Sequence, residues 1–223
     1  MTSWQLLILT PTRSHSHDME PFEIKEALES FQILVDTREQ PTERSKQRLA
    51  AMGFPYQRAT LSYGDYSYTA MVNGKPLHDL TGTIEPFCIV ERKMSIDELA
   101  NNFCEKQKAS PKVLEWNKSH PGERPLRNRF EYEFRRAADH GARMFLIVEN
   151  ATWENVINGK YRSRMDPHAL FGSILAFCVR YHIMLIMCKE ETSGKLIGEL
   201  LYRDFKERLE RGDYDGRGDP GTS

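Results

Sequence analysis

The sequence predicts an α/β fold in which a mixed central β-sheet carries helices on both of its faces. Short apolar runs typical of strands alternate along the chain with longer segments whose apolar residues recur at helical spacing. Gly and Asn residues separate many of these segments, as expected for turns. The chain has 223 residues, of which 39% are hydrophobic and 28% are charged. This composition is typical of a globular protein with a sizeable core and excludes wholesale disorder.

The first half of the expected domain contains most of its strands. The segment Phe-Gln-Ile-Leu-Val-Asp is a compact apolar run that ends in an acid, which indicates a buried strand. Thr42 can cap the helix that follows, and Gly53 can end it. The next two strands are expected to form a hairpin around Gly64 and Asp65. The predicted elements are, in order, a strand at 31–36, a helix at 42–52, strands at 56–62 and 66–72, and a strand at 87–93.

The second half alternates more regularly between helices and strands. Ser95 and Glu98 fit a capping box, so a helix should begin there. Gly141 ends a later helix, and Pro167 lies in the first turn of another. The predicted elements are a helix at 95–106, a loop or broken helix at 109–125, a helix at 127–140, a strand at 144–149, a helix at 167–181, a strand at 183–188 and a helix at 193–209.

The chain divides into one domain with a short segment at each end. Residues 1–30 are interpreted as an N-terminal extension, with a short strand at 4–10 and an amphipathic helix at 21–30. Residues 31–209 form the domain. Residues 210–223 are rich in Gly and charged residues, which predicts a flexible C-terminal tail.

Composition also limits the function classes. The formal net charge is -1, so any nucleic-acid binding must come from a local basic patch. No apolar run approaches the ~20 residues of a membrane span, and the N-terminus lacks the features of a signal peptide. The four cysteines show no C-x-x-C spacing, and reduced, mostly buried thiols in a cytosolic protein are expected. They are Cys88, Cys104, Cys178 and Cys188.

Several predicted strands run directly into acidic residues. Asp36 ends the first strand, Asp65 follows Gly64, and Glu91 lies near the end of the strand at 87–93. Such acids can simply face water. Acids from neighbouring strands can also converge on a hard cation, because carboxylate oxygens suit Mg²⁺ or Mn²⁺.

The spacing of Glu91 and Lys93 indicates which reaction such a metal site could catalyse. Side chains two residues apart on a strand point to the same face. Glu91 could therefore bind a metal while Lys93 places an ammonium beside it, an arrangement that suits phosphodiester hydrolysis. The Glu-x-Lys triplet alone is also compatible with a solvated strand end, because it arises by chance in charged chains.

Three motifs occurring in a fixed order carry more information than the triplet. They are Val35-Asp36-Thr37-Arg38-Glu39, then Gly64-Asp65-Tyr66, then Glu91-Arg92-Lys93-Met94-Ser95-Ile96-Asp97. The series closely resembles the XPF-type nuclease domain of structure-specific endonucleases, whose pattern is Gly-Asp, a variable gap and Glu-Arg-Lys-x-x-x-Asp. The resemblance covers roughly residues 31–209 and includes the late helix and the final strand. It implies a restriction-endonuclease-like core.

The resemblance also implies a role for each matching residue. Arg92 should point away from Glu91 and Lys93 and either pair with an acid such as Asp97 or reach a phosphate. Mg²⁺ is the implied cofactor, with Mn²⁺ as a substitute, and a backbone carbonyl near Arg92 should assist in binding it. The implied catalytic residues are Asp36, Asp65, Glu91 and Lys93, the first three of them metal ligands, and the implied supporting residues are Glu39, Arg92 and Asp97.

Basic residues suggest where DNA could be contacted. Lys160, Arg162 and Arg164 lie in a loop without acids and could bind phosphates, or they could form a solvated loop. Arg38 could contact a phosphate or form a surface salt bridge. The basic run over residues 124–136 is expected to be partly ion-paired through Glu133.

These observations together predict a Mg²⁺-dependent endodeoxyribonuclease. Its expected substrate is branched DNA, such as a flap, fork or junction, in repair, recombination or DNA processing. The alternatives are a catalytically silent DNA-binding subunit of a nuclease complex and a nuclease of plain duplex DNA. No helix-hairpin-helix module is recognisable, so a stand-alone nuclease domain is expected. Its expected location is the cytoplasm of a bacterial or virus-infected cell, or the nucleus of a eukaryote.

The resemblance further implies a homodimer, because domains of this type commonly dimerise. An apolar stripe on the late helix could provide the contact, although the same stripe could belong to the core. The stripe consists of Leu170, Ile174, Phe177 and Cys178.

Overall fold

The computed structural model describes residues 19–104 and 110–214. Its strands are β1 (Gln32–Asp36), β2 (Tyr56–Leu61), β3 (Tyr66–Thr69), β4 (Met71–Val72), β5 (Lys75–Pro76), β6 (Thr83–Ile84), β7 (Cys88–Lys93), β8 (Arg143–Glu149) and β9 (Ile183–Cys188). Its helices are α1 (Pro21–Glu29), α2 (Glu43–Met52), α3 (Ile96–Cys104), α4 (Pro111–Ser119), α5 (Arg129–Asp139), α6 (Trp153–Ile157), α7 (Pro167–Tyr181) and α8 (Glu190–Glu210).

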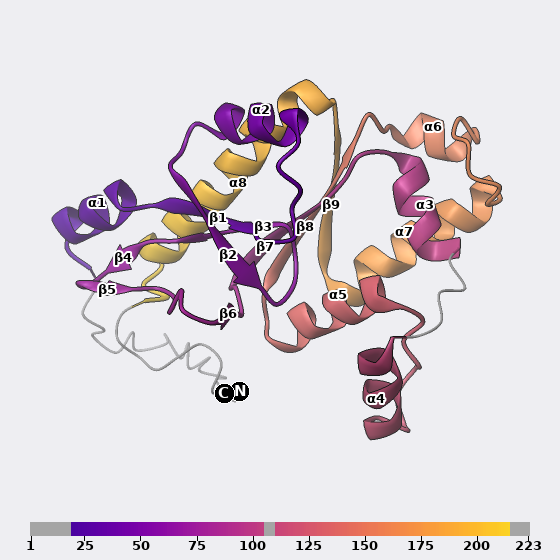
Figure 1. Cartoon of the computed structure of the whole chain (residues 1–223), viewed down its shortest axis with the longest axis horizontal. Helices are drawn as coiled ribbons and strands as arrows, with labels where there is room; N and C mark the ends of the chain where they lie inside the picture. Colours follow the sequence, from indigo (N-terminus) through magenta and orange to yellow (C-terminus); the bar gives the residue numbers. More distant parts are fainter. Residues whose placement is uncertain (1–18, 105–109, 215–223) are drawn as a thin grey trace, which may run out of the picture.

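The central sheet has seven strands in the order β6-β2-β1-β3-β7-β8-β9 (Figure 1). Strand β3 pairs antiparallel with both of its neighbours, and the other pairs in the sheet are parallel. Helices α1, α2 and α8 pack on one face, and α3, α5, α6 and α7 pack on the other. The mixed sheet with helices on both faces confirms the predicted fold class.

The predicted hairpin between the strands at 56–62 and 66–72 is wrong. Strand β1 lies between β2 and β3, pairing parallel with the first and antiparallel with the second. The reason is the composition of β1. Ile33 and Val35 belong to the core on one face of the sheet, and Leu34 belongs to a smaller core on the other. A strand that is apolar on both faces is best placed in the interior of a sheet.

Helix α7 packs its apolar stripe into the core rather than presenting it to solvent. Leu170, Ile174 and Phe177 are buried against β7 and β8, and Cys178 packs beside them. The stripe proposed as a dimer contact is therefore core. The cysteines Cys88, Cys178 and Cys188 are free thiols, as expected.

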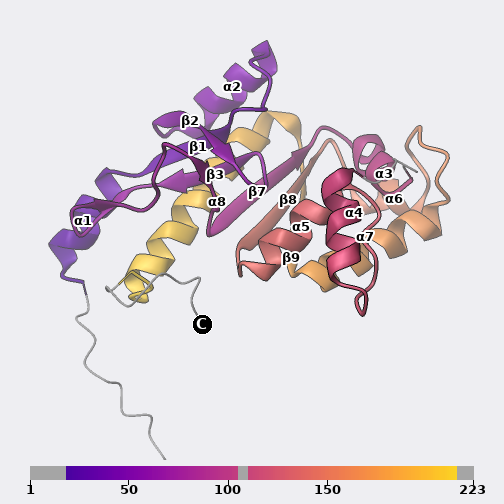
Figure 2. The same cartoon turned by 60° about the horizontal axis from the view of Figure 1, so that its bottom comes forward.

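Several elements differ from the sequence prediction in extent. Helix α4 forms within the segment expected to be a loop or broken helix, and it projects from the body beneath α5 in Figure 1 and lies in front of α7 in Figure 2. Tyr214 belongs to the expected tail, yet it packs on Phe205 and contacts the Tyr68 hydroxyl. The predicted strand at 4–10 lies outside the described residues. None of the described helices has the length and apolar character of a membrane span.

Candidate active site

A cleft at one end of the sheet brings together three of the predicted catalytic residues. Asp65 comes from the connection before β3, and Glu91 and Lys93 come from the end of β7. The cleft has a volume of about 330 Å³, and helices α3 and α5 form its opposite wall. Its other lining residues are Arg38, Gly64, Asn102, Arg129, Phe130 and Glu133.

The backbone fixes Asp65 between two strands. Its N–H donates to the Val90 carbonyl at 3.0 Å, and its carbonyl accepts from the Asp36 N–H at 2.9 Å. The side chain is held as well, because Asp65 Oδ2 accepts the backbone N–H of Arg92 at 2.8 Å. Gly64 makes this path possible, since its φ of +77° is a conformation that favours glycine.

Glu91 and Lys93 lie on the same face of β7, as their spacing predicted. Lys93 Nζ donates to Glu91 Oε1 at 2.7 Å and lies 4.9 Å from the centroid of the Phe130 ring. Both residues are buried, with 7% and 9% of their surfaces exposed. Glu98 of α3, 3.7 Å from Lys93 Nζ, is a further acid, which the sequence pattern predicted only as part of a capping box.

Burial and mutual repulsion dominate the electrostatics of the cleft. Burial raises the pKa of Asp65 well above its ordinary value, and the charge of Glu91 raises it further, against the effect of Lys93. Burial also raises the pKa of Glu91, again opposed by Lys93. Burial acts to lower the pKa of Lys93, but the charges of Glu91 and Asp65 outweigh it, so that pKa is raised. The cleft therefore favours bound cations.

Asp65 and Glu91 fit a hard divalent cation. Asp65 Oδ1 and Glu91 Oε2 accept no hydrogen bond from the part of the chain that the structure describes. Carboxylate oxygens of this kind suit Mg²⁺ or Mn²⁺. Among the described residues, no group of three or more His, Cys, Asp or Glu residues is arranged to hold a metal ion.

The structure does not bring Asp36 into a three-carboxylate group with these two acids. Asp36 Oδ1 accepts from Arg38 Nε at 2.6 Å, and Oδ2 accepts from the Leu61 N–H at 2.9 Å. Arg38 in turn bridges to Glu133 of α5 at 3.1 Å. Of the two interpretations of Arg38, the structure shows the salt bridge, although the side chain also lines the cleft.

Glu39 and Arg92 lie on the opposite face of the sheet from Glu91 and Lys93. Arg92 Nη1 pairs with Glu149 Oε2 at 3.2 Å, and Arg92 Nη2 lies 3.6 Å from Glu39. The predicted direction of Arg92 is correct, but its partners are these acids rather than Asp97. Glu149 was not predicted as a site residue, although it also ends an apolar strand.

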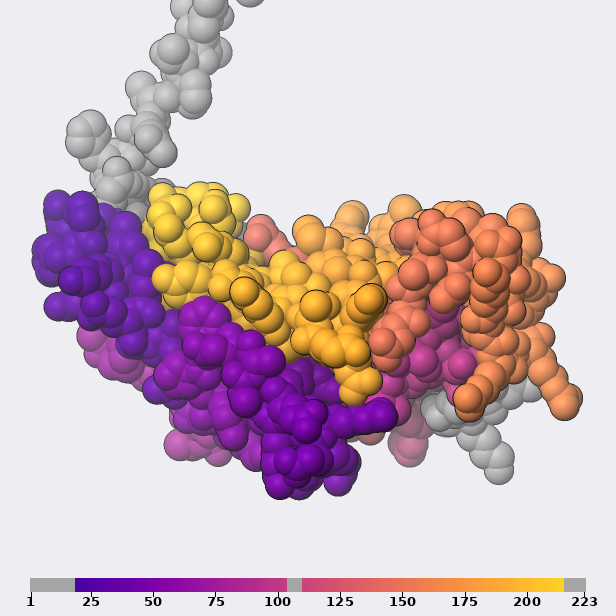
Figure 3. Space-filling model, turned by 90° about the horizontal axis from the view of Figure 1, so that it is seen from above, coloured from indigo at the N-terminus to yellow at the C-terminus, as the bar shows by residue number. Residues whose placement is uncertain are grey.

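Asp97 holds the loop between α6 and α7 in place. Its Oδ1 accepts the backbone N–H groups of Arg162 at 2.6 Å and Ser163 at 2.8 Å. This loop exposes the side chains of Lys160, Arg162 and Arg164 to solvent. In the space-filling view, the orange segment that includes the loop forms one end of the elongated molecule, and α1, in indigo, forms the other (Figure 3).

One family model and two solved structures are similar to this chain. The sequence matches the family model of the ERCC4 domain over residues 35–200, a range that includes every residue of the cleft. The fold is similar to XPF from Aeropyrum pernix, with 20% identity and a TM-score of 0.47, over 82% of this chain and 69% of that one. A second structure, of XPF from Aeropyrum pernix in complex with DNA, gives the same identity and TM-score over 79% and 65%. Comparison with curated proteins gave no sequence match.

Proposed function

The chain belongs to the ERCC4 domain family, and we propose that it is a metal-dependent endonuclease that cuts branched DNA. Family membership supports a DNA nuclease. The observation that supports metal-dependent hydrolysis is the cleft itself, in which the half-buried carboxylate of Asp65 and the buried carboxylate of Glu91 lie with Lys93.

Each residue of the cleft has a distinct task in this proposal. Asp65 and Glu91 would hold Mg²⁺ or Mn²⁺, which when bound supplies Lewis-acid activation of water and of the phosphoryl oxygen. Lys93 remains protonated, because the two carboxylates raise its pKa. Its ammonium orients the phosphate and offsets the negative charge that develops during hydrolysis. Phe130 packs against the ammonium and limits its motion.

The loop held by Asp97 is the proposed contact with the DNA backbone. Lys160, Arg162 and Arg164 are all exposed. Because the net charge of the chain is -1, attraction to DNA must be local and should weaken steeply with salt. Replacing the three side chains with Ala should weaken binding to all DNA substrates about equally, since phosphate contacts carry no sequence information.

The recessed position of the cleft supports a preference for branched DNA. Glu91 and Lys93 expose only 7% and 9% of their surfaces. A strand must therefore bend inward to place a phosphodiester beside them. An unpaired or splayed strand does so more cheaply than a stacked duplex, because no stacking is lost. Asp65, Glu91 and Lys93 form a complete set, which argues against the alternative of a catalytically silent subunit.

A cleavage assay tests this function. Labelled flap, fork, junction and linear duplex DNA are incubated with Mg²⁺, Mn²⁺, Ca²⁺ or EDTA. We expect cutting with Mg²⁺ or Mn²⁺, preference for flap or fork, and none with EDTA. The variants Asp65→Ala, Glu91→Ala and Lys93→Ala should lose about 10²-fold or more of the rate, while Glu199→Gln on α8, whose side chain is 47% exposed, should not.

Three results would contradict the proposal, each at a different point. Full cutting in EDTA would exclude a required metal. Wild-type cutting by Lys93→Ala would exclude the role of the ammonium. Equal rates on flap and linear duplex at matched salt would leave a nuclease of plain duplex DNA.

We further propose that the protein forms a homodimer through the outer surface of α7 and the neighbouring edge strand β9. Leu175, Val179 and Met184 expose 41%, 77% and 53% of their surfaces there. Exposed apolar side chains of this size are typical of contact surfaces when they gather together. Light scattering at micromolar concentration should give twice the monomer mass, and Val179→Asp should give the monomer mass. A monomeric wild type would exclude the dimer.

A further inference from the structure

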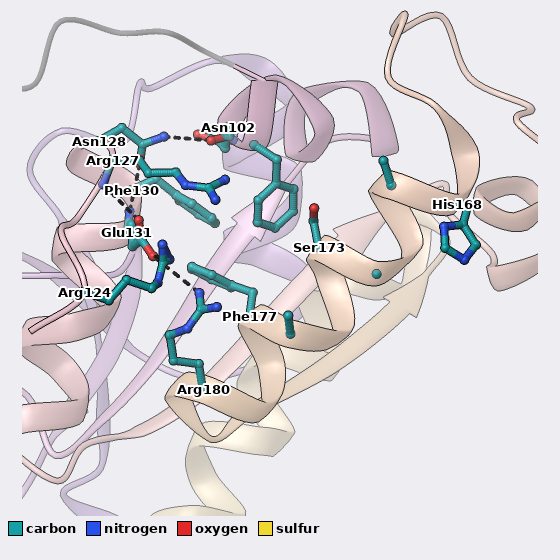
Figure 4. Close-up of a pocket in the computed structure, with 14 residues that line it drawn as sticks. Asn102, Arg124, Arg127, Asn128, Phe130, Glu131, His168, Ser173, Phe177 and Arg180 are labelled. Atoms are coloured by element: carbon teal, nitrogen blue, oxygen red, sulfur yellow. Dashed lines mark hydrogen bonds and ion pairs between the residues drawn. The ribbon is translucent and has the colours of Figure 1, made fainter.

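A second cavity, larger than the active-site cleft, lies directly beside it. It has a volume of about 440 Å³ and lies between α3, α5, α7 and the segment that precedes α5 (Figure 4). Asn102 and Phe130 line both hollows. Phe130 carries Lys93 over its ring and stacks against Phe177 of the second cavity, with 5.1 Å between the ring centroids. One aromatic side chain thus separates this cavity from the catalytic lysine.

Positive charge exceeds negative charge on the wall of the cavity. Among the residues that the structure describes, three arginines line it, and Glu131 is the one acidic residue of the lining. Arg124 pairs with Glu131, and Arg180 Nη1 lies 3.4 Å from the same oxygen. The guanidinium of Arg127 has no ion pair or hydrogen bond within residues 19–104 and 110–214, and only its backbone N–H contacts Glu131. Within the described part of the lining, positive charges exceed negative ones by two, so the cavity favours an anion.

Three phenylalanines and four small residues of α7 form most of the remaining lining, together with Asn102, Asn128 and His168. The rings of Phe130 and Phe177 are nearly parallel, at 9°. Phe103 meets Phe177 edge-on, with 5.5 Å between centroids. Helix α7, which carries Phe177, also contributes small residues that leave the space open, with the Ser173 hydroxyl among them (Figure 4). An aromatic wall beside arginines is the combination that binds the base and phosphate of single-stranded nucleic acid.

We propose that this cavity binds one unpaired nucleotide of the DNA strand whose neighbouring phosphodiester lies in the active-site cleft. The inference rests on the proposed nuclease function and deepens it. Arg127 and Arg180 contact the phosphate, and the base packs against the phenylalanine side of the cavity. A base within a stacked duplex cannot enter without being flipped out, whereas an unpaired base enters freely. The cavity thereby selects strands that are single-stranded next to the cut.

Two variants separate the space of the cavity from its charge. Gly172 of α7 is exposed, and a Cβ added there meets nothing within 4 Å. The first side-chain atom at position 172 thus enters open space, and Gly172→Leu is expected to occupy part of the cavity; it also favours the helix because leucine is a better helix former than glycine. Arg127→Ala removes the unpaired cation. Gly172→Ala, which leaves most of the space, and Arg203→Ala, on the exposed side of α8, are the matched controls.

Binding is measured by fluorescence anisotropy in EDTA, so the result does not depend on cleavage. The probes are a single-stranded oligonucleotide, the same oligonucleotide with abasic sites, a blunt duplex and free thymidine monophosphate as competitor. Gly172→Leu and Arg127→Ala should weaken single-strand binding roughly tenfold and duplex binding less than about twofold. The controls should bind like the wild type. Abasic DNA should bind less tightly and be insensitive to Gly172→Leu.

Other outcomes overturn the proposal. A nucleotide in the cavity is excluded if Gly172→Leu binds single-stranded DNA as tightly as the wild type does. It is also excluded if the variant loses affinity for single-stranded and duplex DNA equally. Abasic DNA that responds to Gly172→Leu like normal DNA excludes the base. Displacement by thymidine monophosphate at the same concentration as the oligonucleotide would assign the cavity to free nucleotides. Cleavage by the wild type with Mg²⁺ is scored separately, so a failed cavity and a failed nuclease give different results.

Discussion

Replacing Gly64 with alanine should damage both stability and catalysis, for reasons that can be separated. Gly64 has a φ of +77°, and an added Cβ would lie 2.9 Å from Ile89 Cβ. The left-handed backbone costs an alanine about 1–2 kcal/mol. The contact with Ile89 costs about 1–3 kcal/mol more, because that Cβ is fixed to strand β7 and cannot turn away. The total loss of unfolding free energy should be about 2–5 kcal/mol.

Gly53 provides a matched control for the backbone term. Its φ is +76°, and an added Cβ there meets nothing within 4 Å. Gly53→Ala should therefore lose only about 1–2 kcal/mol. Urea unfolding of the two variants measures the difference, which belongs to the contact with Ile89.

The catalytic effect of Gly64→Ala follows from the position of its neighbour. Relief of the contact with Ile89 must shift the chain at Asp65, whose carboxylate is proposed to hold the metal. A misplacement of about 1 Å can cost about 10²-fold in rate, so cleavage by Gly64→Ala should fall at least tenfold, while Gly53→Ala should cut like the wild type. Equal destabilisation of the two variants, with unchanged cutting by Gly64→Ala, would refute this reasoning.

Three further predictions concern charge. Burial lowers the pKa of His78 to about 4 from an ordinary 6.5, so the unfolded chain binds the proton at a higher pH than the folded chain does. Between pH 6.5 and about 4 the wild type should therefore lose up to roughly 3 kcal/mol more unfolding free energy than His78→Leu. Parallel curves of unfolding free energy against pH for the two proteins would exclude this. Asp65→Asn removes a carboxylate that repels Glu91, so its Tm in EDTA at pH 7 should exceed that of the wild type. Mg²⁺ should raise the Tm of the wild type only. If Mg²⁺ also raises the Tm of Asp65→Asn, Asp65 is excluded as a metal ligand. Asp97→Ala should release the loop at 158–166 and make it more sensitive to proteolysis. Asp139→Ala on α5 is the control. Equal rates of digestion of the two variants would contradict the role of Asp97.

Local sequence patterns could predict the elements of the fold but not all of their neighbours. The period of two along β7 correctly places Glu91 and Lys93 on one face and Arg92 on the other. The position of β1 between β2 and β3 could not be obtained in this way, because an apolar run identifies a strand without identifying its partners. Helix α4 did have a signal, since Ser110 and Pro111 are a typical N-cap and first residue.

The candidate site shows the same limit at the level of side chains. The motif order identified Asp65, Glu91 and Lys93, which the structure brings into one cleft. It could not show that Asp36 would be bound by Arg38 and the Leu61 N–H, because that depends on how β1 lies against β2. The cavity beside the cleft was equally hidden, since Arg180 meets Arg124 and Glu131 only after α7 packs against α5.

Arg92, which lies between Glu91 and Lys93, connects the two faces of strand β7. The Arg92 backbone N–H holds the Asp65 carboxylate, while its guanidinium is tied to Glu149 behind the sheet. Glu149 is 1% exposed and also pairs with Arg48 at 3.2 Å. Breaking a buried pair by removing one partner costs about 3–5 kcal/mol, so Arg92 is held firmly in place. The position of the Asp65 carboxylate, the proposed metal ligand, is thus set from behind the sheet, by charges on the opposite face of β7.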